Sequence, residues 1–175
     1  MKIISSEQTP NPNAIKFILD GKILDDGSRQ FDSASKVGED LIALALFKVK
    51  SVKSVYFRDD FITVENKDPL EWDRIRTVIE KTVEELESVK SGSDKSKKSD
   101  NKLLLRIESL LDERVRPFLA NDGGGLDVLG LDGKNLMIRY EGACGGCPHA
   151  IMGTLHSIQN LLREEIDSEL NVIPA

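Results

Sequence analysis

The feature that most constrains this chain is a polar stretch near its middle. Residues 88–102 read SVKSGSDKSKKSDNK, in which Ser and Lys fill ten of fifteen positions and Val89 is the only aliphatic residue. Such a segment cannot bury enough apolar surface to offset the entropy of ordering it. The sequence therefore predicts two small domains, over residues 1–88 and 101–175, joined by a flexible Ser/Lys-rich linker over 89–100.

Composition limits the classes of partner. Of the 175 residues, 39% are apolar, which is enough for packed cores, and 24 basic residues face 30 acidic ones for a net charge of −6. Nucleic-acid binding requires a basic face, so no nucleic-acid partner is expected. The longest apolar run, Leu41 to Phe47, is far below the roughly 20 residues that span a bilayer, so no membrane partner is expected either. The N-terminus has no signal sequence, which predicts a cytoplasmic bacterial protein, or an organellar matrix protein whose transit peptide has been removed.

The first half reads as a small α/β domain with a largely antiparallel sheet. Ile15, Phe17 and Leu19 alternate with more polar neighbours and predict a strand with one buried face. Asp68 followed by Pro69 and Glu71 predicts a helix start with a capping box. The remaining expected elements are a helix over 36–47 (apolar at Val37, Leu41, Leu44 and Ala45) and strands over 52–57 and 61–65.

The second half predicts the order α-β-β-α-β, with helices on a small mixed sheet, so that the whole chain is α+β. Its first helix has an apolar stripe at Leu104, Ile107, Leu111, Val115 and Phe118, and Pro117 is expected to kink or tighten its last turn. Three glycines at 123–125 are expected to end that helix. Strands over 126–131 and 135–141 meet at Asp132-Gly133, a hairpin signal. A helix over 150–166 and a strand over 170–173 complete the domain.

Potential chemistry concentrates in Cys144-Gly-Gly-Cys147, the only two cysteines in the chain. Pro148 suits the first position of a helix and so places Cys147 at or next to its N-cap. There, unpaired backbone N–H groups and the helix dipole favour the thiolate form. The two thiolates are expected to be exposed and are the candidate cofactor and metal ligands.

Several kinds of chemistry remain open for this pair. A thiol–disulfide oxidoreductase would cycle it between dithiol and disulfide. Structural zinc needs four ligands, so a zinc-bridged interaction module would need two chains. A [4Fe–4S] cluster is typically held by four cysteine thiolates, so two chains would share one cluster. Two incidental thiols at a helix start also fit the spacing, whereas Pro148 stands where a c-type haem motif requires His.

A cluster shared between half-sites would be released when the subunits part. It could also leave by stepwise thiolate exchange with an acceptor protein. Both properties suit a carrier better than a resident electron-transfer centre. The sequence contains no recognisable Ser/His/Asp set or paired catalytic carboxylates, so an enzyme is not expected.

Several motifs resemble one known family. Thr9-Pro-Asn-Pro-Asn-Ala-Ile-Lys-Phe17, Phe61-Ile-Thr-Val64 and Trp72 are similar to the N-terminal domain of Nfu-type proteins. The chain also resembles the NifU C-terminal domain, at Val115-Arg-Pro117, Asp122-Gly-Gly124 and the run from Gly142 to Pro148. One departure is Gly125, where Asp or Asn is common.

The resemblance implies an iron–sulfur cluster scaffold or carrier rather than an enzyme. It further implies a homodimer that binds a [4Fe–4S] cluster through Cys144 and Cys147. The cluster would come from the iron–sulfur assembly machinery and pass to apo iron–sulfur proteins. Asp122 to Gly125 lacks the features of a phosphate loop, and its expected role is a helix C-cap, with a lesser possibility that it lines the cluster pocket.

Overall fold

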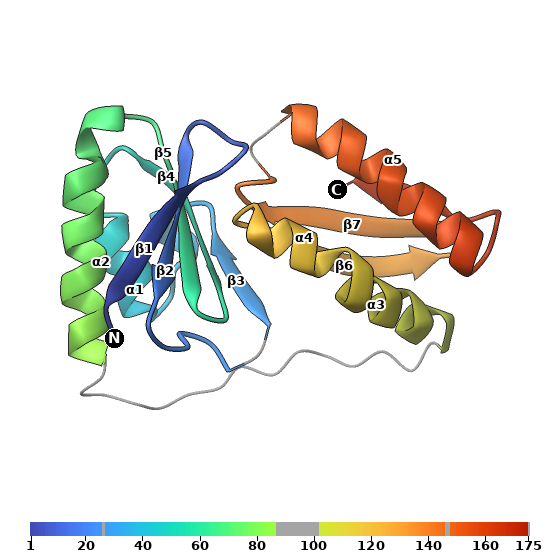
Figure 1. Cartoon of the computed structure of the whole chain (residues 1–175), viewed down its shortest axis with the longest axis horizontal. Helices are drawn as coiled ribbons and strands as arrows, with labels where there is room; N and C mark the ends of the chain where they lie inside the picture. Colours follow the sequence, from blue (N-terminus) through green and yellow to red (C-terminus); the bar gives the residue numbers. More distant parts are fainter. Residues whose placement is uncertain (26, 87–101, 146–147, 175) are drawn as a thin grey trace. The chain divides into compact units, whose positions relative to one another are not determined.

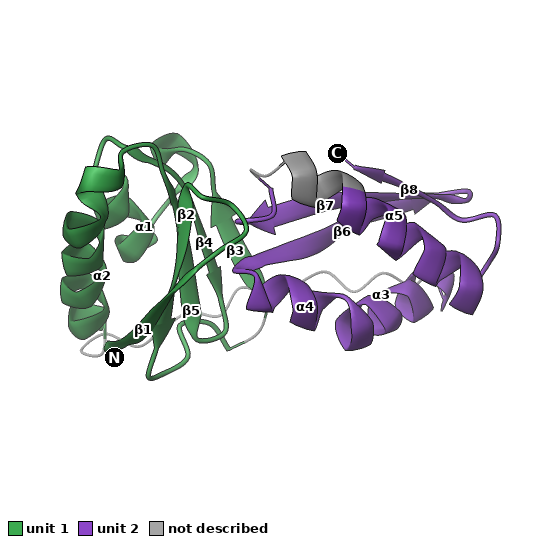
Figure 2. Cartoon of the chain, turned by 45° about the horizontal axis from the view of Figure 1, so that its top comes forward, with its two compact units in different colours: residues 1–95 green, residues 96–175 purple. Residues whose placement is uncertain are grey.

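The computed structural model describes residues 1–25, 27–86, 102–145 and 148–174, with the backbone alone for 148–152. The chain forms two compact units, over residues 1–95 and 96–175, and each has its own sheet and core (Figures 1 and 2). The predicted α+β fold class is confirmed. The predicted linker over 89–100 lies outside the described residues, and the predicted domain limits stay a prediction.

Unit 1 is a five-stranded antiparallel sheet with helices on one face (Figure 2). Its strands lie in the order β1-β2-β5-β4-β3. The elements are β1 (Ile3–Gln8), β2 (Ala14–Leu19), β3 (Ser28–Phe31), η1 (Ala34–Lys36), α1 (Leu41–Leu46), β4 (Val52–Arg58), β5 (Phe61–Asn66), η2 (Pro69–Glu71) and α2 (Trp72–Leu86).

Alternation along the central strands produces the core of unit 1. Phe17 and Leu19 on β2 are buried together with Ile62 and Val64 on β5, against the inner faces of α1 and α2. Lys16 lies on the opposite sheet face, where its ammonium pairs with a Glu7 carboxylate oxygen at 3.4 Å. The predicted strand at residues 15–19 is therefore confirmed.

The predicted helix over 36–47 is wrong in length and in its buried face. Gly38 has φ 60°, and the α-helix begins only after Asp40, whose side chain accepts a hydrogen bond from the Ala43 N–H. Consequently Leu41 and Leu44 are exposed, at 55% and 38%. The buried residues of the segment are Val37, Ile42, Ala43 and Leu46.

Helix α2 begins close to its predicted start, but without a capping box. Asp68 caps the short η2 turn by accepting a hydrogen bond from the Leu70 N–H at 3.0 Å. The Glu71 carboxylate pairs with Arg74 at 3.2 Å, one helical turn further along.

Unit 2 is a three-stranded mixed sheet with three helices packed on one face (Figure 1). Its strand order is β6-β7-β8, with β6 antiparallel and β8 parallel to β7. The elements are α3 (Lys102–Arg114), α4 (Arg116–Asn121), β6 (Gly124–Asp132), β7 (Asn135–Gly142), α5 (Pro148–Glu165) and β8 (Asn171–Pro174).

The hairpin between β6 and β7 forms as predicted. Gly133 has φ 59°, the left-handed conformation that a tight hairpin requires. Leu136, Ile138 and Tyr140 lie on one face of β7 and are all buried, which confirms the predicted stripe. This face of the sheet is the one that contacts the helices.

The predicted helix from residue 104 to 118 is two helices with a break at Val115. Pro117 lies in the first turn of α4, because proline lacks the N–H that a continuous helix would need there. The break rotates the second segment, so Phe118 is 74% exposed and Leu119 is buried instead. The expected burial of Phe118 is therefore wrong.

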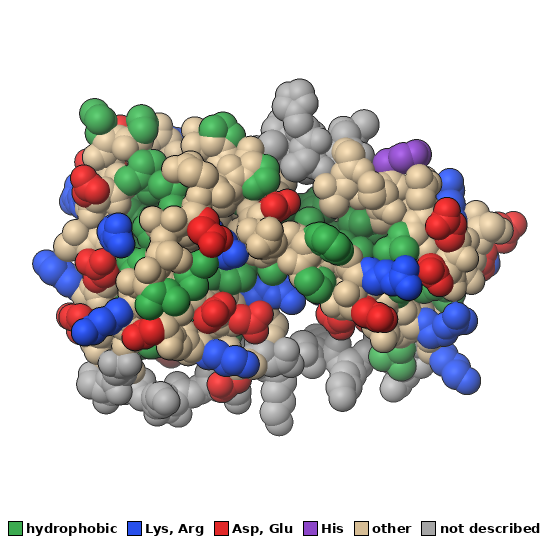
Figure 3. All heavy atoms as spheres, in the orientation of Figure 1, with side chains coloured by type: hydrophobic (Ala, Val, Ile, Leu, Met, Phe, Trp, Pro, Cys, Tyr) green, Lys and Arg blue, Asp and Glu red, His purple; other side chains and the backbone are tan. Residues whose placement is uncertain are grey.

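Acidic and basic side chains intermingle on the face of both units that Figure 3 shows. Across the described ranges, no helix is both long enough and apolar enough to cross a bilayer.

Candidate functional site

Cys144 lies in the turn that leads from strand β7 toward helix α5. Gly142, the last residue of β7, has φ 63°, which allows the chain to leave the sheet sharply. Two backbone hydrogen bonds fix the turn. Ala143 N–H donates to the Gly123 carbonyl at 3.1 Å, and Gly145 N–H donates to the Gly142 carbonyl at 3.2 Å. The structure thus places Cys144 between a strand end and a helix start.

The second predicted ligand, Cys147, lies outside the described residues. Helix α5 begins at Pro148, and the side chain of the neighbouring His149 also lies outside the description. The role of Cys147 as a ligand and its place at an N-cap therefore stay predictions.

The Cys144 side chain is buried, whereas the sequence predicted an exposed thiolate. Its exposed fraction is 6%, and it belongs to the apolar core of unit 2 together with Tyr140 and Leu126. The cause is the turn, because the hydrogen bond from Ala143 to Gly123 holds residue 144 against the start of strand β6. The predicted exposure is wrong for this cysteine.

Gly124 forms the wall against which the thiol packs. A Cβ atom at residue 124 would lie 2.5 Å from the Cys144 Sγ, 2.8 Å from the Glu141 carbonyl oxygen and 3.0 Å from the Cys144 Cβ. Real Cβ atoms essentially never approach other atoms this closely. A side chain at this position would therefore displace the thiol.

The glycine run thus has two separate functions. Gly123 has φ 74°, and its N–H bonds to the Ala120 carbonyl, which ends helix α4 as predicted. Gly124 lies in strand β6, opposite Gly142, and lines the thiol. The predicted C-cap is confirmed for Gly123, whereas the lesser possibility, that the run lines a cluster pocket, stays a prediction.

Gly145 allows the turn after Cys144 to stay compact. A Cβ atom there would lie 2.9 Å from the Tyr140 carbonyl oxygen, a backbone atom that cannot move aside cheaply. The two glycines on either side of the thiol, Gly124 and Gly145, therefore contribute close backbone approach rather than chemical groups.

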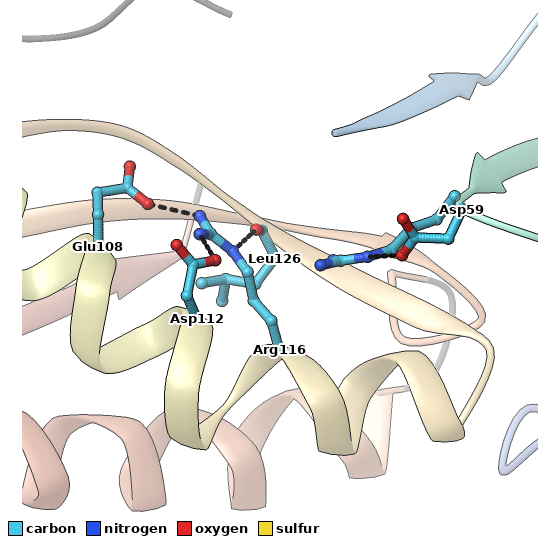
Figure 4. Close-up of polar contacts among 6 residues, drawn as sticks. Asp59, Glu108, Asp112, Arg116 and Leu126 are labelled. Atoms are coloured by element: carbon cyan, nitrogen blue, oxygen red, sulfur yellow. Dashed lines mark hydrogen bonds and ion pairs between the residues drawn. The ribbon is translucent and has the colours of Figure 1, made fainter. Parts of the chain in front are cut away.

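Arg116 ties two helices to the strand that carries Gly124 (Figure 4). Its Nε donates to the Leu126 carbonyl at 3.2 Å, Nη2 donates to Glu108 at 2.6 Å, and Nη1 donates to Asp112. Burial alone would lower the pKa of Arg116, but the hydrogen bonds and charges of Asp112 and Glu108 outweigh it and raise that pKa. Sequence reasoning missed this anchor, although the spacing 108, 112 and 116 indicates one helical face.

Tyr140 is the second polar side chain beside the cysteine. It is 7% exposed, and its hydroxyl is enclosed without a hydrogen-bond partner in the described part of the chain. Burial, and secondarily the charge of Cys144, raise the pKa of Tyr140 well above that of a free tyrosine. Its phenol therefore stays in the neutral form that can donate a hydrogen bond.

The donor set at this turn is suited to a thiophilic metal. Among the described side chains, no three His, Cys, Asp or Glu residues gather closely enough to hold a metal ion. The available ligand is the Cys144 sulfur, and cysteine thiolates are the usual ligands of iron–sulfur clusters. At Gly124 the backbone, with no side chain, packs directly against that sulfur. The site fits a sulfur-ligated group that other ligands complete.

Comparison with protein families matches both halves of the chain. Residues 4–90 match the family described as "Scaffold protein Nfu/NifU N terminal". Residues 107–173 match the family described as "NifU-like domain". The two matches occur in the order that the sequence motifs predicted.

Curated relatives align over most of the chain. The human protein "NFU1 iron-sulfur cluster scaffold homolog, mitochondrial" is 31% identical over 173 residues, which is 91% of this chain and 66% of that protein. The protein of the same name from Drosophila ananassae is 28% identical over 98% of this chain and 65% of its own length. That from Drosophila willistoni is 28% identical over 91% and 59%. The chain therefore spans about two thirds or less of these relatives.

Two solved structures also align with part of the chain. An X-ray structure of protein SAV1430 from Staphylococcus aureus is 28% identical, covers 47% of this chain and 99% of its own, and has a TM-score of 0.40. A solution structure from Staphylococcus epidermidis is 29% identical, covers 49% and 98%, and has a TM-score of 0.38.

Proposed function

This chain belongs to the Nfu/NifU family of scaffold proteins, and from that membership we propose that it carries an iron–sulfur cluster. The cargo is a [4Fe–4S] cluster held between two copies of the chain. The ligands are Cys144 and Cys147 of each copy. The cluster comes from the iron–sulfur assembly machinery and passes to apo iron–sulfur proteins, so the chain needs no catalytic turnover of its own.

The observation that carries this proposal is the contact between Gly124 and the Cys144 sulfur. A Cβ at residue 124 would lie 2.5 Å from that sulfur, so the fold keeps one wall of the thiol free of side chains. The surrounding apolar core limits water near the sulfur, and a dry shell stabilises bound clusters and tunes them.

The number of ligands supports two copies. A [4Fe–4S] cluster is typically held by four thiolates, and the chain contains two cysteines. Joining two half-sites supplies four ligands. Separation of the copies, or stepwise exchange with an acceptor thiolate, then releases the cargo.

The proposed compartment is a reducing one, where free thiols persist. The three relatives named above are described as mitochondrial, which agrees with an organellar matrix. A bacterial cytoplasm is the other compartment that supplies these conditions.

Anaerobic reconstitution with iron and sulfide tests the proposal. Wild type, Cys144→Ala and Cys147→Ala are compared, and Ser157→Ala, which changes an exposed hydroxyl on α5, serves as a control. We expect brown protein with about two irons and two sulfides per chain in wild type and control. Both cysteine variants are expected to lose the colour and the iron.

The oligomeric state and the metal content distinguish the other outcomes. Holo-protein that elutes from gel filtration as a monomer with its cluster intact contradicts the shared site. Stoichiometric zinc with no colour indicates a zinc-bridged module. Absence of iron uptake, with a reversible dithiol–disulfide couple instead, indicates an oxidoreductase.

A further inference from the structure

The Tyr140 hydroxyl is a buried polar group that the packing of unit 2 does not explain. Tyr140 lies on the same face of strand β7 as Leu136 and Ile138, opposite Leu126 on β6, in the apolar core of unit 2. Its position could be filled by an apolar side chain of similar size. The hydroxyl is the only part of the residue that packing does not explain.

That hydroxyl has no acceptor in the described part of the chain. Its oxygen is enclosed, and no described residue or backbone group forms a hydrogen bond with it. Buried hydroxyl groups almost always have a partner, because burial without one forfeits their bonds to water. An unpaired group beside a binding site therefore indicates an acceptor that arrives with the ligand.

The Cys144 thiol lies in the same buried cluster as Tyr140. A negative charge on Cys144 contributes to raising the pKa of the Tyr140 phenol. The Tyr140 carbonyl oxygen also packs against Gly145, 2.9 Å from where a Cβ atom of residue 145 would lie. The phenol and the thiol thus share one apolar compartment at the end of β7.

We propose that Tyr140 is a positioning residue for the bound cluster, and that its phenolic O–H donates a hydrogen bond to a sulfur atom of the loaded site. This inference rests on the proposed function. The acceptor is either the Cys144 thiolate or an inorganic sulfide of the cluster. Both are anionic sulfur, and both are absent from a protonated thiol site.

The expected consequence is electronic. Hydrogen bonds to cluster or cysteine sulfur withdraw negative charge and raise the reduction potential of the cluster. A donor in an apolar interior acts more strongly than one in water. Removing the hydroxyl should therefore lower the potential without removing a ligand.

Tyrosine substitution tests the inference in the full chain. The protein contains two tyrosines, so Tyr140→Phe is the test, and Tyr56→Phe, a buried tyrosine of unit 1, is the matched control. All proteins are reconstituted with iron and sulfide. We expect equal iron content in the three proteins, a reduction potential shifted downward in Tyr140→Phe, and no shift in Tyr56→Phe.

A second modification, fluorination of Tyr140, should shift the reduction potential in the opposite direction. In the Tyr56→Phe background Tyr140 is the only tyrosine, so growth with fluorotyrosine labels that residue alone. A more acidic phenol donates a stronger hydrogen bond, and the reduction potential should shift upward. Potentials that do not change with either modification overturn the inference.

Vibrational spectra test the same hydrogen bond directly. Resonance Raman spectra of the wild-type cluster in light and heavy water should show shifted iron–sulfur modes, and the shift should disappear in Tyr140→Phe. Labelling the inorganic sulfide with a heavy isotope identifies whether bridging or cysteine modes respond. A wild type that binds no cluster overturns the proposed function and this inference together, whereas a loaded wild type without the isotope shift overturns this inference alone.

Discussion

Gly124 shapes the surroundings of the candidate ligand more directly than any charged residue. Its missing side chain lets strand β6 pass against the Cys144 sulfur, where a Cβ would come within 2.5 Å. The restriction is local. At Gly130, on the same strand, an added Cβ would meet only the Met137 Cε, at an ordinary 3.7 Å.

A methyl group at residue 124 should therefore damage the site. We expect Gly124→Ala to lower the free energy of unfolding by about 1–3 kcal/mol, because the core around the thiol is overpacked. Iron uptake on reconstitution should fall as the thiol is displaced. Urea denaturation and iron analysis measure the two effects, and Gly130→Ala serves as the control. Wild-type iron uptake and stability in Gly124→Ala would contradict the proposed role of the glycine.

At the scale of the elements, the site depends on how α3, α4 and β6 are held together. The Arg116 side chain, only 14% exposed, links all three through Glu108, Asp112 and the Leu126 carbonyl (Figure 4). Leu126 lies two residues after Gly124. The guanidinium therefore also fixes the strand that forms one wall of the thiol.

Removing the guanidinium should be costly. We expect Arg116→Met to lower the free energy of unfolding by about 2–3 kcal/mol, because the Leu126 carbonyl and Glu108 lose a partly buried, charged partner. Chemical denaturation provides the measurement. Arg76→Met is the control, because Arg76 pairs with Glu80 at 3.3 Å with both side chains 46% exposed, and such a pair contributes less than about 0.5 kcal/mol. Equal losses of unfolding free energy in the two variants would contradict the role of Arg116 in holding α3, α4 and β6 together.

Replacing glycine by alanine should have opposite effects on the free energy of unfolding at two positions outside the cysteine site. Gly153 lies in helix α5, and no atom of the described residues comes within 4 Å of an added Cβ, whereas Gly133 has φ 59° in the β6–β7 hairpin. We expect Gly153→Ala to raise the free energy of unfolding by about 1 kcal/mol, because alanine favours the helix. Gly133→Ala should lower it by about 1 kcal/mol, because L residues resist positive φ. Thermal and urea denaturation of both variants provide the measurement, and changes of the same sign would be inconsistent with this account.

At the scale of the whole molecule, the two units have separate cores. The core of unit 1 is drawn from residues 1–86 and that of unit 2 from residues 103–172. Both cysteines of the chain lie in unit 2. The proposed cluster-binding role therefore belongs to unit 2, and residues 1–95 of unit 1 contain no cysteine that could add a ligand.

Division of the chain tests this separation. We expect a fragment of residues 101–175 to fold and to take up iron and sulfide, because its core and its ligands are complete. A fragment of residues 1–88 should fold without binding iron. Circular dichroism, denaturation and iron analysis are compared with the intact chain. Failure of the 101–175 fragment to bind a cluster, while the intact chain binds one, would show that unit 1 contributes to the site.

Some elements escaped prediction because their own residues carry little signal. Strand β1 is mostly exposed and β3 has no buried residue, so neither shows a pattern of apolar alternation. Each is held instead by backbone hydrogen bonds to a neighbouring strand, β2 or β4. The helix around α1 was misjudged because Gly38 and Asp40 interrupt an otherwise helical spacing.

What the sequence by itself determined is local. Alternation at Leu136, Ile138 and Tyr140 specified a strand with one buried face, Asp132-Gly133 specified its hairpin, and the motif around Cys144 specified a turn between strand and helix. These patterns act over a few neighbouring residues, where backbone sterics and side-chain spacing decide the outcome. Family membership also followed from such short motifs.

Only the tertiary structure decided which residues meet across the chain. The strand order, the exposure of Phe118, the burial of Cys144 and its contact with Gly124 all depend on segments that pack together after distant parts of the chain converge. Close packing makes each of these outcomes depend on the shapes of its neighbours. The spacing of the cysteines therefore predicted the ligands, whereas the three-dimensional fold alone determined the glycine wall, the enclosed sulfur and a phenol without a hydrogen-bond partner among the described residues.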